Sequence, residues 1–354
     1  LNQVSGLILA EDIFSPIDVP SFDNSAMDGY AMDFDANTRE WELNGVIQAG
    51  DTSVTKVEKG YAVRIFTGAK IPPGANTVIP QELIQLDENA AKIFYAHNKI
   101  TTGSNVRKKG AQCAKGDLII SKGTKTTPGI IGLLASVGLA KVPVYTPPSV
   151  ALIITGDELK EVGAELKEGE IYNSNGPMLE AFLKKSGIRN ISAYSAKDEK
   201  HELQQIINEA LFKHDVLILS GGISVGDYDF VKECLDFARV RELFYKVKQR
   251  PGKPFFAGKK EQKWVFALPG NPASVISCYN QYVKPCLTFM LGGEKVWEPD
   301  EVLQLEKAHQ KKPGLTFFVK AIKESGKVRV LEGQQSFNLQ AFASANCLVE
   351  LKEE

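Results

Sequence analysis

Residues 215–229 read Asp-Val-Leu-Ile-Leu-Ser-Gly-Gly-Ile-Ser-Val-Gly-Asp-Tyr-Asp, an apolar run that passes directly into a loop of glycine, serine and aspartate. An uninterrupted apolar run of this length is typical of a β-strand that is buried on both faces. The pattern recurs at residues 150–155 (Val-Ala-Leu-Ile-Ile-Thr) and 264–268 (Trp-Val-Phe-Ala-Leu). Helical patterns separate the three runs, so the sequence predicts an α/β domain with a parallel or mixed sheet and flanking helices.

The connecting helices are predicted from apolar periodicity and capping residues. In the clearest, residues 198–213, one face carries Leu203, Ile206, Ile207, Ala210 and Leu211. Further helices are expected at residues 175–186, at 227–238 and from Asn271-Pro272 toward Tyr282. Because Pro147-Pro148 precedes the first strand, we place this α/β domain at residues 149–290.

The flanking regions are predicted to be mostly β. Residues 1–148 show short runs of β-formers between glycine-containing turns, with an irregular β subdomain inserted at about 33–125. One helix is expected after Thr127-Pro128, ending at Gly138. Candidate strands in a last domain, residues 291–354, are Leu315–Ile322, Val328–Leu331 and Cys347–Leu351.

Composition excludes several classes of protein. The chain has 354 residues, 42 Lys and Arg against 43 Asp and Glu, and a net charge of −1, which argues against binding of nucleic acid. No apolar run reaches the roughly 18–20 residues of a membrane helix. The five cysteines form no CxxC pair, which excludes a zinc ribbon and favours a reducing, cytoplasmic location. Since the chain begins at Leu1 without methionine, we expect a short segment to precede it.

Each of the three apolar runs ends in a loop that contains glycine. In open parallel sheets ligands bind outside the carboxyl ends of the strands, and glycine lets backbone N–H groups approach a phosphate. The alternative is that tight turns need glycine for their geometry alone. The candidate substrate-binding residues in these loops are Gly156, Ser220, Gly221, Gly222, Ser224, Gly226, Pro269, Gly270, Asn271 and Pro272.

Carboxylates in these loops allow two interpretations. Glu158 and Asp229 follow neighbouring strands and are candidates to hold Mg²⁺ beside a phosphate, because magnesium in proteins is bound through one or two carboxylates and waters. Asp227, in contrast, is accounted for by capping of the helix that follows.

A cationic segment lies at residues 246–254, Lys-Val-Lys-Gln-Arg-Pro-Gly-Lys-Pro. If residues 246–249 form a strand, Lys246, Lys248 and Arg250 share one face, and the Pro-Gly turn presents Lys253. The cluster then suits a small oxyanion or phosphate. The alternative is a solvated edge strand protected by its charges.

Two polar loops in the N-terminal region, residues 20–31 and 66–76, are rich in Asp, Asn, Ser, Thr and Gly. From the residues alone they are equally compatible with a structural and a ligand-binding role.

Six ordered motifs together resemble the molybdopterin molybdenumtransferase (MoeA) family, the bacterial relatives of the C-terminal domain of gephyrin. The motifs are Ser-Phe-Asp-Asn-Ser-Ala-Met-Asp-Gly-Tyr-Ala at 21–31, Thr-Gly-Ala at 67–69, Thr-Gly-Asp-Glu-Leu at 155–159, Ser-Gly-Gly-Ile-Ser-Val-Gly-Asp-Tyr-Asp at 220–229, Pro-Gly-Lys-Pro at 251–254 and Leu-Pro-Gly-Asn-Pro at 268–272. They cover the chain from Leu7 to about residue 350.

The resemblance implies a fold, a reaction and an assembly. The fold is a central α/β molybdopterin-binding domain with a mostly β N-terminal region and a small C-terminal β-barrel. The reaction inserts molybdate into adenylylated molybdopterin with Mg²⁺ and releases AMP and molybdenum cofactor. The assembly is a homodimer whose cleft lies between the central domain of one subunit and the N-terminal region of the other, with a molybdopterin adenylyltransferase as the expected upstream partner.

Functional residues follow from the same motif matches. The resemblance implies catalytic roles for Asp28, Thr67, Glu158, Asp198 and Asp229, and substrate contacts from Lys246, Arg250, Pro269, Pro272 and Ser336. Three positions depart from the family pattern: Gln112 replaces an acidic residue, Arg250 stands where lysine is common, and Lys320 replaces an arginine.

Two other functions are weighed against this one. A scaffold protein, as the gephyrin relationship allows, is disfavoured because the chain has no second molybdopterin-binding domain and no long linker. A nucleotide-processing enzyme that shares only the central domain, like the competence-damage family, is disfavoured by the loop at residues 22–31 and by the first 150 residues.

Overall fold

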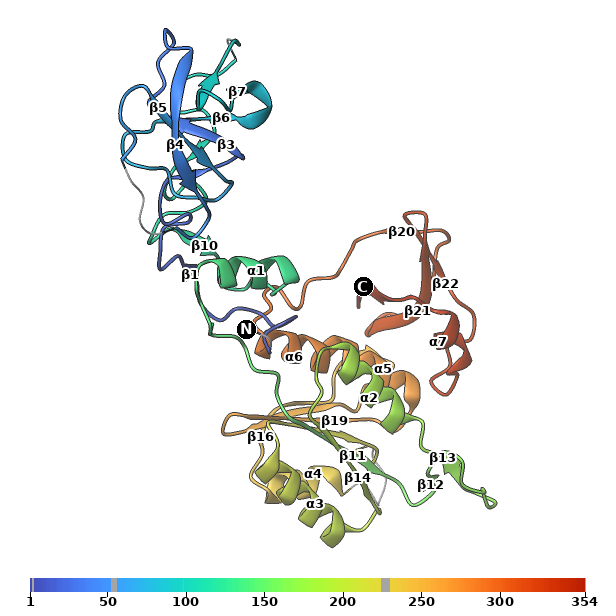
Figure 1. The fold of residues 1–354 in the computed structure, drawn as a ribbon. Coiled ribbons are helices and arrows are strands. Elements are labelled where there is room, and N and C mark those ends of the chain that lie inside the picture. Colours follow the sequence, from blue (N-terminus) through green and yellow to red (C-terminus); the bar gives the residue numbers. More distant parts are fainter. Residues whose placement is uncertain (2, 52–55, 98, 224–229, 354) are drawn as a thin grey trace. The chain divides into compact units, whose positions relative to one another are not determined.

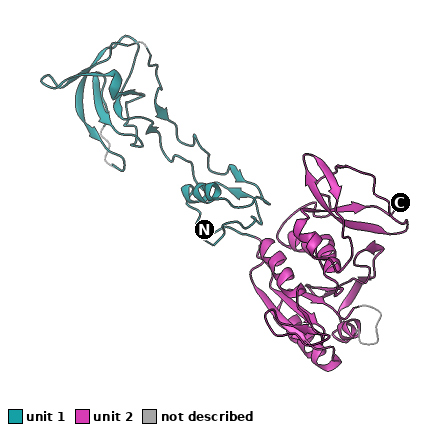
Figure 2. Cartoon of the chain, turned by 90° about the vertical axis from the view of Figure 1, so that its right-hand side faces the viewer, with its two compact units in different colours: residues 1–144 teal, residues 145–354 magenta. Residues whose placement is uncertain are grey.

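The structure is a computed structural model that describes residues 1–354 except 2, 52–55, 98, 224–229 and 354. The chain forms two compact units, Leu1–Val144 and Tyr145–Glu354, each with its own sheets (Figure 2). We describe each unit by itself. No helix within the described ranges combines the length and the apolar character that crossing a membrane requires.

A six-stranded sheet forms the centre of the second unit (Figure 1). Its strands, in spatial order, are β14 (Ile191–Ala196), β11 (Val150–Thr155), β15 (Val216–Ser220), β19 (Lys263–Leu268), β18 (Phe256–Lys260) and β16 (Arg241–Tyr245). The first four run parallel, whereas β18 is antiparallel to both of its neighbours. All three apolar runs are therefore confirmed as strands, and the sheet is mixed.

Helices cover both faces of this sheet. They are α2 (Asn175–Lys185), α3 (Lys200–Lys213), α4 (Val231–Phe237), α5 (Pro272–Cys278) and α6 (Lys284–Met290), with a π-helical turn over Tyr279–Val283. Alternate residues of β11 enter two separate cores: Leu152 packs with α2, α5 and α6, and Ile153 packs with α3 and α4. This two-sided burial explains why the strands read as unbroken apolar runs. The expected start of the helix at residue 227 lies outside the described residues.

The last residues of the second unit form, together with the two-residue strand β17 (Gln249–Arg250), a five-stranded sheet that contains every strand expected there. Its other members are β20 (Gln304–Leu305), β21 (Thr316–Glu324), β22 (Lys327–Val330) and β23 (Cys347–Leu351), with helix α7 (Gln340–Ser344) beside them. A separate short pair joins β12 (Leu159–Lys160) to β13 (Ile171–Tyr172).

The prediction of a strand over residues 246–249 is wrong. Strand β16 ends at Tyr245, Lys246 has a φ of +61°, and β17 contains only Gln249 and Arg250. The reason is Gln249, whose buried side chain accepts a 2.5 Å hydrogen bond from the Tyr282 hydroxyl and donates a 3.0 Å bond to the carbonyl of Pro251. Because this side chain points inward, the cations of the segment do not share one face of a strand.

The first unit is mostly β, as expected. Its largest sheet contains β6 (Thr77–Pro80), β3 (Gly29–Met32), β5 (Tyr61–Ile65), β4 (Glu40–Ile47), β8 (Lys92–Phe94) and β7 (Gln85–Asp87), with a 3₁₀ turn at Gln81–Leu83. Two short pairs join β1 (Ile13–Phe14) to β10 (Leu118–Ile120) and β2 (Asn24–Ser25) to β9 (Val106–Arg107). Helix α1 (Pro128–Ser136) begins as predicted, with the Thr127 hydroxyl accepting a 3.3 Å bond from the Ile130 N–H.

Candidate functional site

The three glycine loops of the second unit meet at the carboxyl end of the parallel strands. A Cβ atom at Gly221 would lie 2.5 Å from the carbonyl oxygen of Thr155, so the end of β15 touches the end of β11. The Gly221 N–H donates a 3.1 Å bond to the carbonyl of Leu268, the last residue of β19. A Cβ atom at Gly270 would lie 3.8 Å from the Cα of Gly221. The predicted convergence of the loops is confirmed, and only glycine at 221 permits it.

Asn175 ties two of these loops together. Its side-chain Nδ2 donates to the hydroxyl of Ser220 at 3.1 Å and to the carbonyl of Gly270 at 2.7 Å. Sequence reasoning used Asn175 only as the start of a helix and missed this bridge. An asparagine at a helix start that faces strand ends is the signal that was available.

Two buried oxygen atoms at this sheet end have no hydrogen-bond partner among the residues that the structure describes. They are Oδ1 of Asn175 and Oγ1 of Thr155. A buried polar atom without a partner costs about 1–3 kcal/mol, so such atoms are normally satisfied by a ligand or an ordered water. This pair makes the sheet end a candidate place for a polar ligand in the second unit.

Acidic groups border the same sheet end. Gly156 has a φ of +148°, and a Cβ there would lie 2.8 Å from Oε2 of Glu158, so the carboxylate folds back over this glycine. The Asp198 N–H donates to Oδ1 of Asp157 at 3.3 Å, which brings the loop after β14 to the loop after β11. Three other predicted residues, Ser224, Gly226 and Asp229, lie outside the described residues.

The groups at this sheet end carry the type of ligand atom that magnesium prefers. Glu158, Thr155 and Asn175 offer oxygen atoms, the donors that Mg²⁺ prefers in proteins. Within the described ranges, no three His, Cys, Asp or Glu side chains gather closely enough to hold a metal ion. The described residues therefore offer suitable oxygen atoms but do not form a complete ligand set by themselves.

Ser336 lies against the first turn of α5. Its carbonyl accepts a 3.1 Å bond from the Ala273 N–H, one residue after Pro272. The loop that carries Ser336 is held by Lys320, which is 2 % exposed and donates through Nζ to the carbonyls of Gly333 at 2.9 Å and of Gln335 and Asn338 at 3.0 Å. The Lys320 ammonium therefore shapes this loop through its three backbone partners.

The predicted oxyanion residues Lys246, Arg250 and Lys253 are all exposed. The turn between them packs on α5, because a Cβ at Gly252, where φ is +91°, would lie 2.5 Å from the Cys278 Sγ. The guanidinium of Arg250 lies 5.5 Å from the centre of the Phe317 ring on β21. The segment therefore follows the side of α5, the helix that begins at Pro272.

In the first unit, the structure joins the two residues that the motifs singled out. Oδ1 of Asp28 accepts hydrogen bonds from the Thr67 N–H at 2.7 Å and from its hydroxyl at 2.8 Å. These two bonds lower the pKa of Asp28, so the carboxylate stays ionised. Both side chains are exposed, and the pair presents a fixed negative charge to solvent.

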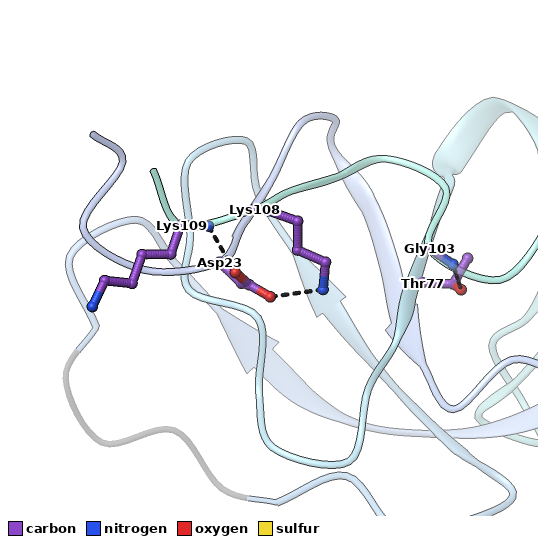
Figure 3. Close-up of polar contacts among 5 residues, drawn as sticks. All are labelled: Asp23, Thr77, Gly103, Lys108 and Lys109. Atoms are coloured by element: carbon purple, nitrogen blue, oxygen red, sulfur yellow. Dashed lines mark hydrogen bonds and ion pairs between the residues drawn. The ribbon is translucent and has the colours of Figure 1, made fainter. Parts of the chain in front are cut away.

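The loop that carries Asp28 is anchored by Asp23 (Figure 3). Its carboxylate accepts 2.8 Å bonds from the Lys108 ammonium and from the Lys109 N–H, and the Lys108 contact lowers the pKa of Asp23. The Gly103 N–H donates to the Thr77 hydroxyl at 3.0 Å (Figure 3). This bond holds the chain shortly before Lys108 and Lys109. Asp23 therefore has a structural role, whereas the exposed Asp28 carboxylate is accessible to a ligand.

These two units define a class of protein: an α/β domain with a polar, glycine-lined sheet end, preceded by a β-rich region with a charged loop. Comparison with known families agrees. Residues 1–138 match "MoeA N-terminal region (domain I and II)", and residues 151–288 match "Probable molybdopterin binding domain".

Relatives that match this chain over nearly its whole length point to the same family. A protein of Haemophilus influenzae named molybdopterin molybdenumtransferase is 37% identical, covering 100% of this chain and 89% of its own length. A Staphylococcus aureus protein of the same name is 36% identical over 97% of this chain and 84% of its own length. A solved molybdopterin biosynthesis moeA protein from Pyrococcus horikoshii superposes with a TM-score of 0.83 at 32% identity, over 99% of this chain and 88% of that one. The chain belongs to the molybdopterin molybdenumtransferase family.

Proposed function

We propose that this chain completes molybdenum cofactor by inserting molybdate into adenylylated molybdopterin, with release of AMP. Molybdenum keeps its oxidation state in this reaction. Molybdate oxygens leave as water while Mo–S bonds form to the dithiolene, and water cleaves the phosphoanhydride bond to give AMP. The observation that carries the proposal is the sheet end where Gly221 and Gly270 meet, beside oxygens of Thr155 and Asn175 that have no partner among the described residues.

The glycine loops bind the adenylyl phosphates in this proposal. Backbone N–H groups approach a phosphate where no Cβ intervenes, and the close packing around Gly221 excludes larger residues. Glu158 and Asp229 hold Mg²⁺, and the bound ion supplies neutralisation of the charge that develops on the leaving phosphate. Asp198, whose N–H already bonds the Asp157 carboxylate, keeps the neighbouring loop in place.

The oxyanion is bound by cations and a hydroxyl. Lys246, Arg250 and Lys253 belong to the segment whose turn at Gly252 packs on α5, and Ser336 reaches the first turn of that helix. Each charge-assisted contact to an anion contributes about 1.5–3 kcal/mol. A planar guanidinium at residue 250 adds the possibility of a paired contact that a lysine does not make.

The central experiment measures AMP release from adenylylated molybdopterin as molybdate and Mg²⁺ are varied. We expect Asp229→Asn to slow AMP release strongly while far-UV circular dichroism and thermal unfolding stay as in the parent chain. Lys248→Ala, which removes an exposed cation that pairs with Glu353, serves as a surface control. A folded Asp229→Asn protein with unchanged Mg²⁺ dependence would remove the metal role.

We further propose a homodimer whose active cleft combines the Asp28–Thr67 loop of one subunit with the glycine loops of the other. The support is that Asp28 and the sheet end belong to different units of the chain. Mixed dimers of Asp28→Ala and Asp229→Ala chains should regain activity in one of two sites. A fully active monomer in sedimentation at micromolar concentration would contradict the shared cleft. A molybdopterin adenylyltransferase is the proposed upstream partner, and the cytoplasm the proposed location.

A further inference from the structure

A second polar depression of the α/β domain lies at the opposite end of the sheet from the glycine loops. It has a volume of about 700 Å³ and is lined by Asn208, Phe237, Ala238, Arg239, Arg241, Lys259, Lys260 and Glu261. Lys260 pairs with Lys263 at the start of β19, whereas the glycine loops follow the end of that strand. No step of the proposed reaction uses these residues.

The four cations of this depression outnumber its one carboxylate, Glu261, and repel one another. Arg241 on β16 lies directly opposite Lys259 on β18, and like charges in such a cross-strand pair are destabilising. The carboxylates that flank the cluster in sequence, Asp236 and Glu242, both pair with Lys232, at 2.6 and 3.0 Å. Among described residues, none of the four cations makes an ion pair. An anion is the group that would relieve this repulsion.

Arg239 and Glu261, which line the depression, also have unfavourable backbone conformations. Arg239 follows the end of α4 with a φ of +58°, a conformation in which glycine is strongly preferred. The Val240 N–H donates to the carbonyl of Leu235 at 3.0 Å, which closes the helix end and fixes that conformation. Glu261, in the turn after β18, has a φ of +53°. The chain thus places an arginine at position 239 where glycine would be more stable, which favours a function for the Arg239 side chain.

We propose that this depression binds a phosphorylated small molecule, with its phosphates held by Arg239, Arg241, Lys259 and Lys260. The cations come from the end of α4, from β16 and from β18, so they surround one volume instead of forming a stripe. That arrangement suits a compact polyanion, and the volume falls in the usual range for small ligands. The Phe237 ring, 69% exposed, borders the depression and offers an apolar face to the rest of the ligand.

The test is a titration of the full chain with pyrophosphate, followed by the backbone amide signals in NMR. We expect saturable shifts at residues 237–241 and 259–261. Arg241→Gln should weaken the pyrophosphate Kd at these amides about tenfold, which corresponds to about 1.4 kcal/mol. The matched control is Arg329→Gln, an exposed arginine on β22, and it should leave this Kd unchanged. Signals of Gly221 and Gly270 report the strand-end site separately.

Arg239→Gly separates binding from structure. Glycine relieves the positive φ, so the melting temperature should stay or rise while pyrophosphate binding weakens about tenfold. A purely structural arginine would lose stability and leave the Kd unaltered. The proposal is overturned if amides 237–241 do not respond to pyrophosphate, or if both variants bind it as the parent does. Tighter binding of a decaglutamate peptide than of pyrophosphate would overturn the ligand class and indicate a protein partner.

Discussion

Gly221→Ala is expected to disrupt the sheet end where β11 and β15 meet. The residue has a φ of +102°, which side chains other than glycine rarely adopt and which costs about 1–3 kcal/mol. The new methyl group would lie 2.5 Å from the Thr155 carbonyl oxygen and 2.6 Å from its hydroxyl. Overpacking of this kind costs about 1–3 kcal/mol, so we expect the second unit to lose about 2–6 kcal/mol of unfolding free energy.

The control for this substitution is Gly187→Ala. Its φ is +85°, and no atom lies within 4 Å of the added Cβ, so it carries the backbone cost without the clash. Pulse-labelling hydrogen exchange in urea, read on peptides from β11 and β15, measures the unfolding free energy of this unit directly. Gly221→Ala should lose clearly more stability than Gly187→Ala and should abolish AMP release. Equal losses in the two variants would refute the close approach to Thr155 as the reason for glycine.

Three further outcomes are expected. Lys320→Met should lower stability by about 3 kcal/mol, because three partly buried carbonyls lose their donor, and Lys320→Arg should restore part of it in urea denaturation. Burial lowers the pKa of His214 below 6.5, so the unfolded chain binds the proton more readily; stability should fall as the pH drops below about 6.5, and His214→Phe should flatten that dependence in thermal melts. Arg250→Ala should raise the molybdate concentration for half-maximal AMP release roughly ten- to a hundredfold, whereas Lys248→Ala should leave it unchanged.

The α/β domain was largely predictable because its central strands β11, β15 and β19 are mostly buried on both faces. Unbroken apolar runs as short as residues 150–155 are typical of central strands in a parallel sheet, and the glycine loops after them pointed to one sheet edge. Helix α1 was equally accessible, since Thr127 and Pro128 are local start signals.

What sequence reasoning missed depends on contacts between distant residues. The bridge from Asn175 to Gly270 and the three carbonyls around Lys320 form only when separate elements pack. The strand considered at residues 246–249 is absent for the same reason. The buried Gln249 side chain is oriented by its hydrogen bond with Tyr282, a residue distant in sequence, and this breaks the alternation that a strand requires. The repulsion between Arg241 and Lys259 became visible only with the register of β16 and β18.

The bond between Ser336 and Ala273 has a consequence for the newly made protein. During synthesis the glycine loops and α5 leave the ribosome well before the segment that Lys320 organises, so the first turn of α5 initially lacks the carbonyl that accepts the Ala273 N–H. A nascent chain therefore has the sheet end without its final neighbour. The first turn of α5 therefore completes its hydrogen bonding only after the last sheet has folded against it, so the two parts of this unit mature in the order in which they are synthesised.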